Sequence, residues 1–214
     1  MARRELRGGL KNFRILIACL ALGVAAIAAV ESMKQAIETG LKVEGAVLLG
    51  GDAEAEFVYR FASQEERSGL EEIGDQISEV ADFRSMIVVR HKDEKLRALT
   101  QIKAIDSAYP LIGQVQLFGG SDFRAALTAQ DGLSSVLMER LLVERLGLRV
   151  GDRLYIGSKS FRLGGIVKSL PDTAGDNFGL GPRTLVYKAD LEGSGLLGPG
   201  TFFSSKYRLI TPTN

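Results

Sequence analysis

Hydrophobic and polar positions divide the chain into one long apolar stretch followed by many short amphipathic segments. Ile15–Val30 contains no charged or strongly polar side chain, and no helix breaker separates it from Gly40. At about 1.5 Å per residue this stretch is roughly 24 Å long, short for a membrane span, but flanking residues can extend it. The pattern predicts a transmembrane helix over residues 13–33 that continues as a stalk helix over residues 34–51.

Charge on the two sides of this stretch indicates its orientation. Five bases and one acid precede it: Arg3, Arg4, Arg7, Lys11 and Arg14 against Glu5. Acids outnumber bases just after it, and basic excess stays in the cytoplasm. We therefore expect residues 1–12 to form a cytoplasmic basic tail and residues after about 34 to be periplasmic.

One side of the predicted membrane helix carries small residues. Ala21, Ala25 and Ala29 follow a small-xxx-small spacing, which lets a second helix approach closely and which lipid alone does not require. This spacing favours a partner helix in the membrane. The alternative is an alanine-rich anchor that faces lipid only.

Two other interpretations of the apolar stretch remain open. Its basic start and Ala26-Ile27-Ala28 fit a cleaved secretory signal, although the stretch continues directly into the helix-compatible residues 33–38. Leu16-Ile17-Ala18-Cys19 fits a lipobox pattern, but a lipobox closes its apolar run, whereas this one opens it. A membrane helix that is retained explains the pattern best.

The segment after the stalk predicts an α/β sandwich. Asp52–Phe61 alternates as a strand, with Ala53, Ala55, Phe57 and Tyr59 on its buried side. Ser63–Glu66 forms a capping box for a helix whose buried stripe is Leu70, Ile73 and Ile77. Residues 80–105 predict a β-hairpin that turns at His91–Lys95, and Val115–Phe118 a further short strand.

Gly119–Asp122 is a candidate boundary, and the sequence beyond it is dense in predicted strands. A helix is expected from Ser134 or Ser135 to Leu146, ended by Gly147. The later elements are expected in this order: strands Arg153–Ile156, Phe161–Val167 and Leu185–Tyr187, a short helix or turn Lys188–Gly195, and a last strand Thr201–Ile210. The fold class is therefore α+β.

Composition excludes several classes of protein. The chain has 214 residues and a net charge of +1, and bases are balanced by acids outside the first 14 residues, so nothing suggests nucleic-acid binding. Its one cysteine, Cys19, lies in the apolar stretch, so the chain cannot form an internal disulfide.

Motifs that carry chemistry are missing from the sequence. It contains no P-loop, no G-x-G-x-x-G and no G-x-S-x-G, and the single histidine, His91, has no cysteine or second histidine nearby to share a metal. The acid pairs Glu65-Glu66 and Glu71-Glu72 fall on a helix exterior. Asp172 and Asp176 could bind a cation but lack further acids at regular spacing. We predict no catalytic, cofactor-binding or metal-binding residue, and hence no enzyme.

Several segments together carry a family resemblance. They are Arg4–Arg7, the alanine-rich span, Leu48–Asp52, Ile102–Gly113 with its Tyr109-Pro110, Leu146–Asp152 and Gly181-Pro182-Arg183. In this order they resemble the N-terminal part of MacB/FtsX-like ABC transporter permeases, closest to the YbbP-like branch. The resemblance covers essentially the whole chain.

The resemblance implies a two-part periplasmic domain: a porter-like α/β subdomain at 52–120, an inserted β-rich subdomain at 121–200, and a return strand at 201–214. It implies a permease subunit in the bacterial inner membrane that works with a separate cytoplasmic ABC ATPase and with further transmembrane helices. The subunit would transmit ATP-driven movement to the outer domain, in the export or extraction of hydrophobic compounds. Because the chain stops at Asn214, before a second helix, we expect a fragment of a longer permease.

A second interpretation belongs to another class. A single-span envelope protein whose outer domain is a binding or scaffolding module would show the same apolar stretch and the same outer domain. It predicts indifference to the identity of the small residues in the membrane helix.

Overall fold

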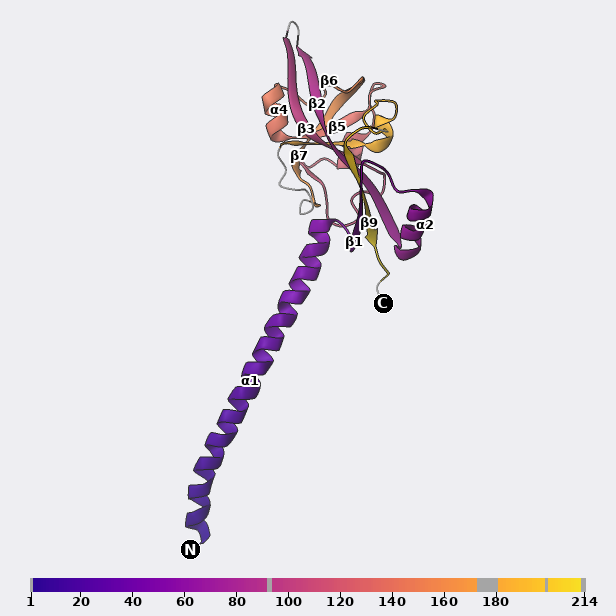
Figure 1. Cartoon of the computed structure of the whole chain (residues 1–214). Helices are drawn as coiled ribbons and strands as arrows, with labels where there is room; N and C mark the ends of the chain where they lie inside the picture. The colour runs from indigo at the N-terminus through magenta and orange to yellow at the C-terminus, as the bar shows by residue number, and fades with distance from the viewer. Residues whose placement is uncertain (1, 92–93, 173–180, 199, 213–214) are drawn as a thin grey trace. The chain divides into compact units, whose positions relative to one another are not determined.

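The computed structural model describes residues 2–91, 94–172, 181–198 and 200–212 (Figure 1). The chain divides into two compact units, Met1–Gly45 and Ala46–Asn214. The first unit is helical over its described residues, 2–45, and the second contains all of the described strands together with short helices. This mixture confirms the α+β class.

Helix α1 spans Ala2–Leu49 without interruption. Within it, Leu16–Ile37 is long and apolar enough to cross a membrane, and none of it is buried by the rest of the chain. The helix ends at Leu49, two residues before the predicted end of the stalk at residue 51, because Gly50 has a φ of +78°, a left-handed conformation that glycine adopts without a steric penalty.

The second unit is built on one mixed sheet. Its strands are β1 Ala53–Val58, β2 Gln76–His91, β3 Glu94–Ile105, β4 Gln116–Leu117, β5 Ser135–Glu139, β6 Arg153–Ile156, β7 Lys159–Ser169, β8 Arg183–Tyr187 and β9 Phe203–Ile210. The strand order is β1-β9-β2-β3-β8-β5-β7-β4, and β6 pairs with both β2 and β7. Most pairs are antiparallel, but β3 with β8 and β5 with β7 run parallel.

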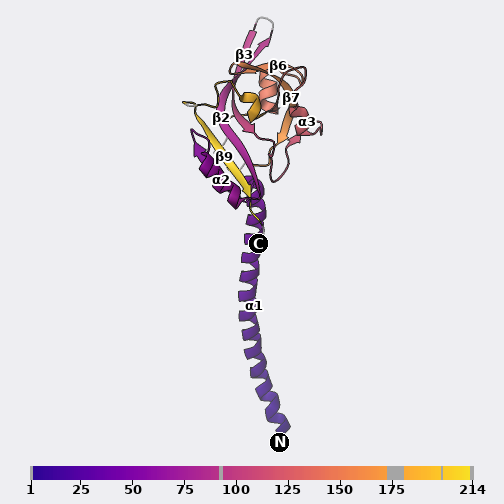
Figure 2. The same ribbon diagram turned by 90° about the vertical axis from the view of Figure 1, so that its right-hand side faces the viewer.

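The long strand β2 takes part in two arrangements (Figure 2). Its first half, Gln76–Phe83, pairs with β9, which in turn pairs with β1. Its second half pairs with β6 at Ile87 and Val88, and this contact closes the ring β2-β3-β8-β5-β7-β6 into a small barrel. The hairpin of β2 and β3 is therefore shared by both arrangements.

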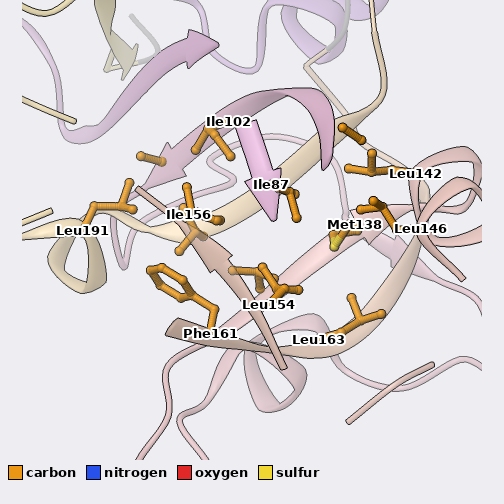
Figure 3. Close-up of a cluster of buried hydrophobic side chains, with 14 of the residues drawn as sticks. Ile87, Ile102, Met138, Leu142, Leu146, Leu154, Ile156, Phe161, Leu163 and Leu191 are labelled. Carbon is orange, nitrogen blue, oxygen red and sulfur yellow. The ribbon is translucent and has the colours of Figure 1, made fainter. Parts of the chain in front are cut away.

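The barrel interior is the larger of two apolar clusters in the second unit (Figure 3). Odd-numbered residues of β2, such as Ile87 and Val89, point into it together with Leu154, Ile156 and Phe161. The remaining helices are short: α2 Gln64–Ile73, α3 Phe123–Leu127, α4 Arg140–Leu146 and the 3₁₀ turn η1 Lys188–Leu191. Side-chain alternation along β2 therefore separates an inner from an outer face.

Several local predictions are confirmed. Ser63 accepts a hydrogen bond from the Glu66 N–H while the Glu66 carboxylate accepts from the Ser63 N–H, which is the predicted capping box. The hairpin over 80–105 is present as β2 and β3, with β2 starting earlier, at Gln76. Strand β6 has the predicted bounds, and Gly147 has the left-handed conformation expected after α4.

The helix predicted from Ser134 or Ser135 to Leu146 is wrong in its first half. Ser135–Glu139 is strand β5, and only Arg140–Leu146 is helical. Val136, Leu137 and Met138 are all fully buried, because Val136 and Met138 belong to one apolar cluster and Leu137, on the other face of β5, belongs to the second. A short run of apolar residues that is buried on both sides does not reveal its period.

Two predicted buried positions are also wrong. Ile77 belongs to β2 because α2 ends at Ile73, and Ile73 itself is 60% exposed. Tyr59 follows the end of β1 with a φ of +63° and is 59% exposed, its ring packed edge-to-face on Phe202. Tyr59 lies beyond the end of β1, and Ile77 lies beyond the end of α2, so the period of the preceding element no longer reports burial at these positions.

Candidate functional site

A buried cluster of charged and polar side chains is centred on Asp172. One carboxylate oxygen accepts a hydrogen bond from the Lys103 ammonium at 2.6 Å, and the other accepts one from the Tyr109 hydroxyl at 2.6 Å. The Arg208 guanidinium also donates to the Asp172 carboxylate. All four residues are almost completely buried, so their charges are screened by one another and not by water.

The sheet register brings these charges together. Glu54 on β1 stands directly opposite Arg208 on β9, and the Arg208 Nε donates to the Glu54 carboxylate at 2.9 Å. Asp82 on β2 stands directly opposite Lys103 on β3, and the Lys206 ammonium lies 3.8 Å from Asp82. Opposite charges therefore alternate across four neighbouring strands on one face of the sheet.

Burial and charge shift the pKa values in this cluster in opposite directions. Burial works against ionisation of Asp172, but the adjacent Lys103 and Arg208 outweigh it and lower the pKa of the carboxyl. Burial, together with the Asp172 charge, raises the pKa of Tyr109 well above its ordinary value. Asp172 is thus ionised and Tyr109 is a neutral hydrogen-bond donor at physiological pH.

Gly50, the residue that follows α1, packs closely against this cluster. Gly50 and Gly51 are both buried, and a Cβ added at Gly50 would lie 2.9 Å from the Asp172 Cβ and 3.2 Å from the Arg208 Cδ. Only glycine fits between the helix end and the two side chains, and its positive φ is needed as well. The cluster therefore joins β1, β3, β9 and the residues that leave α1.

A second buried acid lies on the opposite face of the same strands. Glu79, in β2, accepts from the Lys188 ammonium at 2.7 Å and from the Arg67 guanidinium at 3.2 Å, which connects β2 to η1 and to α2. Asp106 binds the backbone N–H groups of Glu79 and Tyr109 at 2.7 and 2.9 Å. These contacts hold the start of the loop that carries Tyr109.

Two of the acids considered above as candidates for metal binding or acid–base chemistry are paired with basic side chains of the protein. Asp172, considered for a cation site, already holds two protein cations, and Asp176 lies outside the described residues. Glu66 binds Arg60 at 2.6 and 2.8 Å, and this contact and the cap lower its pKa to about 2. His91 ends β2 and its side chain is outside the description. Within the described ranges, no three His, Cys, Asp or Glu gather as metal ligands.

A hollow of about 630 Å³ lies elsewhere in the second unit. It is lined by Gln114–Asp122 and by Lys168. Asp122 already accepts from the Ala125 N–H as the cap of α3. The hollow therefore offers space and backbone groups but no set of groups arranged for catalysis.

Sequence reasoning did not single out Lys103, Tyr109 and Arg208 as partners. Alternation in Asp52–Phe61 places Glu54 on the side away from the predicted buried one, and it assigns no partner to Glu54. A usable signal was present, since acids repeat at alternate positions in β1 and bases repeat at Lys206 and Arg208 in β9. Only the pairing of β1 with β9 turns these two patterns into ion pairs.

This chain is similar in sequence to a known permease. No family model matches the chain. It is 26% identical over 193 residues to a protein of Escherichia coli (strain K12) named "Uncharacterized ABC transporter permease YbbP", a match that covers 88% of this chain and 22% of the relative. The predicted resemblance to MacB/FtsX-like ABC transporter permeases of the YbbP-like branch is thereby confirmed, and the chain spans about a fifth of that permease.

Solved structures of low sequence identity are also similar. The extracellular domain of the noncanonic ABC-type transporter YknZ from Gram-positive bacteria has a TM-score of 0.46 and 14% identity, covering 73% of this chain and 83% of that one. The periplasmic region of MacB from Actinobacillus actinomycetemcomitans has a TM-score of 0.45 and 11% identity, covering 77% and 78%.

Proposed function

We propose that this chain is the N-terminal part of the permease subunit of an ABC transporter in the bacterial inner membrane. The similarity to the permease YbbP supports the class, and the candidate membrane span Leu16–Ile37 supports the location. The basic excess before this span supports an orientation with residues 1–12 in the cytoplasm and residues after about 34 in the periplasm.

The proposed role is mechanical and not catalytic. A separate cytoplasmic ABC ATPase hydrolyses ATP, the membrane helices move, and α1 passes this movement to the outer domain for the export or extraction of hydrophobic compounds. The observation that carries this proposal is the close seat of Gly50 on Asp172 and Arg208. Because Gly50 directly follows α1 and has no space beside the buried ion cluster, a shift of Gly50 would move the strands that hold the cluster.

We further propose that the outer domain works as two parts, residues 52–120 with the return strand 201–214, and residues 121–200. The pairing of β1, β9 and the first half of β2 supports the first part. The barrel that contains β5, β6, β7 and β8 supports the second. Strands β2 and β3 contribute to both, so a displacement of one part is transmitted to the other.

Co-purification of the full-length gene product with its ABC ATPase tests the proposal. We expect the ATPase to co-purify, and replacement of Ala21, Ala25 and Ala29 by leucine to abolish assembly with the other transmembrane helices. The matched control replaces Val24, Ile27 and Val30 by leucine, on the opposite side of α1, and should assemble normally.

A different result would support the single-span alternative. If no ATPase co-purifies and both triple variants behave like the wild type, the membrane helix is an anchor and the outer domain is a binding or scaffolding module. The two hypotheses differ in this measurement because only a transporter helix requires close packing against other helices.

A further inference from the structure

The outward face of the barrel carries basic side chains from four neighbouring strands. By the strand register, the positions on this face are the even-numbered residues 84–90 of β2, the odd-numbered residues 95–101 of β3, Arg153 and Tyr155 of β6, and Ser160 and Arg162 of β7, which precede the β-bulge in that strand. Six of them are cationic: Arg84, Arg90, Lys95, Arg97, Arg153 and Arg162. We call this set the basic face; Figures 1 and 2 show its strands β2, β3 and β6 close together.

Like charges stand directly opposite one another on the basic face. Arg90 is the register partner of Lys95, and Arg153 is the register partner of Arg162. Direct opposition of like charges in a sheet is destabilising. There is no acid at the outward positions of these strands, which lie within residues 84–90, 95–101, 153–155 and 160–162. None of the six cations has an ion pair with a described residue.

Apolar and aromatic groups lie among these cations. Met86 stands opposite Leu99, and the two are 43% and 47% exposed although both are large hydrophobic residues. The Arg90 guanidinium lies over the Tyr155 ring, 4.9 Å from its centroid. The whole chain has a net charge of only +1, so the basic face is a local concentration and not a consequence of a basic protein.

We propose that the basic face is a docking surface for an acidic segment of a partner protein. Arginine guanidinium groups bind carboxylates in a bidentate geometry, and a carboxylate between two opposed cations would relieve their repulsion. The basic face contains five arginines and one lysine, together with Met86 and Tyr155. This is the composition of a protein interface, in which arginine, methionine and tyrosine are enriched and lysine is depleted. This composition favours a protein over a lipid surface.

The dimensions of the basic face indicate a weak and reversible contact. Strands spaced by about 4.8 Å and rising about 3.3 Å per residue give a face on the order of 400 Å², below the roughly 800 Å² that each partner contributes to a stable complex. Association should therefore depend strongly on ionic strength, since exposed charges supply most of the attraction. This inference does not depend on the transporter function proposed above.

Binding of a labelled polyglutamate peptide tests the proposal. The full chain is held in nanodiscs of the zwitterionic lipid phosphatidylcholine, and affinity is measured by fluorescence anisotropy at low and high salt. We expect salt-sensitive binding that is weakened about tenfold or more in the double variant Arg90→Glu and Arg153→Glu. The matched control, Arg145→Glu with Lys168→Glu, reverses two exposed charges elsewhere and should bind like the wild type.

A thermal unfolding measurement separates docking from a structural role. Each glutamate in the double variant stands opposite a remaining cation, Lys95 or Arg162, so the melting temperature should stay the same or rise while binding is lost. A lower melting temperature together with lost binding would overturn the proposal, because the face would then be structural.

Two further results would also overturn it. Equal loss of binding in the control variant would mean that the peptide responds to total charge only. Strong cosedimentation of the full chain with phosphatidylglycerol vesicles, abolished by the double variant, without any binding of the peptide would assign the face to anionic lipid instead.

Discussion

The Lys103 ammonium lies 2.6 Å from the Asp172 carboxylate, and the two side chains are exposed by only 1% and 0%. Arg208 reaches the same carboxylate from β9, and Tyr109 donates to its other oxygen. Two cations and one anion are thus buried together with a neutral donor. Such a group tolerates the removal of one member poorly, since the charge that remains has no water to replace its partner.

The first prediction concerns Asp172→Asn. This change leaves Lys103 and Arg208 buried without their shared anion, and we expect the free energy of unfolding to fall by about 3–5 kcal/mol. Denaturant unfolding of the full chain in neutral detergent, followed by pulse proteolysis of the outer domain, measures the loss.

Glu144→Gln is the matched control for this substitution. It also breaks an ion pair, with Arg140 at 2.7 Å, but both of those side chains are about 60% exposed. Exposed pairs contribute about 0–1 kcal/mol, so the control should be nearly neutral. Equal losses in the two variants would mean that the Asp172 cluster has no special place in the stability of the domain.

The second prediction is a pH dependence that Asp172 produces. Its pKa is lowered in the folded chain by Lys103 and Arg208, despite the opposing effect of burial, so its stabilisation is present above the pKa of the unfolded chain, about 4. The stabilisation is lost as the pH falls through the lower, folded pKa. Stability of the wild type measured from pH 7 downward should therefore decline below about pH 4 more steeply than that of Asp172→Asn. Parallel curves for the two proteins would contradict this assignment.

The third prediction concerns Gly164 in β7. A Cβ at this position would lie 1.9 Å from the backbone oxygen of Ala126 in α3, a contact that no side-chain rotation can relieve. Gly164→Ala must push α3 away from the sheet, and we expect a loss above about 2 kcal/mol or failure to fold.

Gly198→Ala serves as the control for Gly164→Ala. Gly198 has no heavy atom within 4 Å of an added Cβ, so alanine meets open space. Its melting temperature should match that of the wild type, whereas the yield and the melting temperature of Gly164→Ala should both fall. A normal melting temperature for Gly164→Ala would show that α3 does not need its close approach to β7.

The fourth prediction compares two glycines of the stalk region. Gly50→Ala introduces a Cβ that lies 2.9 Å from the Asp172 Cβ at a φ of +78°, and should cost about 1–3 kcal/mol. Gly40 lies inside α1, and a Cβ added there has no heavy atom within 4 Å. Gly40→Ala should therefore stabilise the helix by up to about 1 kcal/mol.

Thermal unfolding and limited proteolysis at the end of α1 distinguish these two substitutions. Gly50→Ala should lower the melting temperature and expose residues 49–51 to protease, while Gly40→Ala should do neither. If Gly50→Ala were as stable as Gly40→Ala, the helix end would not rest tightly on the Asp172 cluster, and the mechanical proposal would lose its main support.

Local sequence rules were sufficient for several elements of this protein. The apolar stretch, the capping box at Ser63, the hairpin over 80–105 and the left-handed Gly147 each follow from residues close together in the chain. These features depend on hydrophobic period, on side chains that bind a neighbouring N–H, and on the conformational freedom of glycine, and none of them requires knowledge of a distant partner.

The sequence by itself thus determined the helix, most strand positions and the resemblance to a permease. Tertiary structure alone decided that Ser135–Glu139 is a strand, because β7 and β8 pair with its two edges and the two apolar clusters cover its two faces. It also decided that Glu54, Lys103, Asp172 and Arg208 form one buried cluster. Ion pairs between residues far apart in the chain depend on strand order and register, and these are settled by the packing of the whole domain.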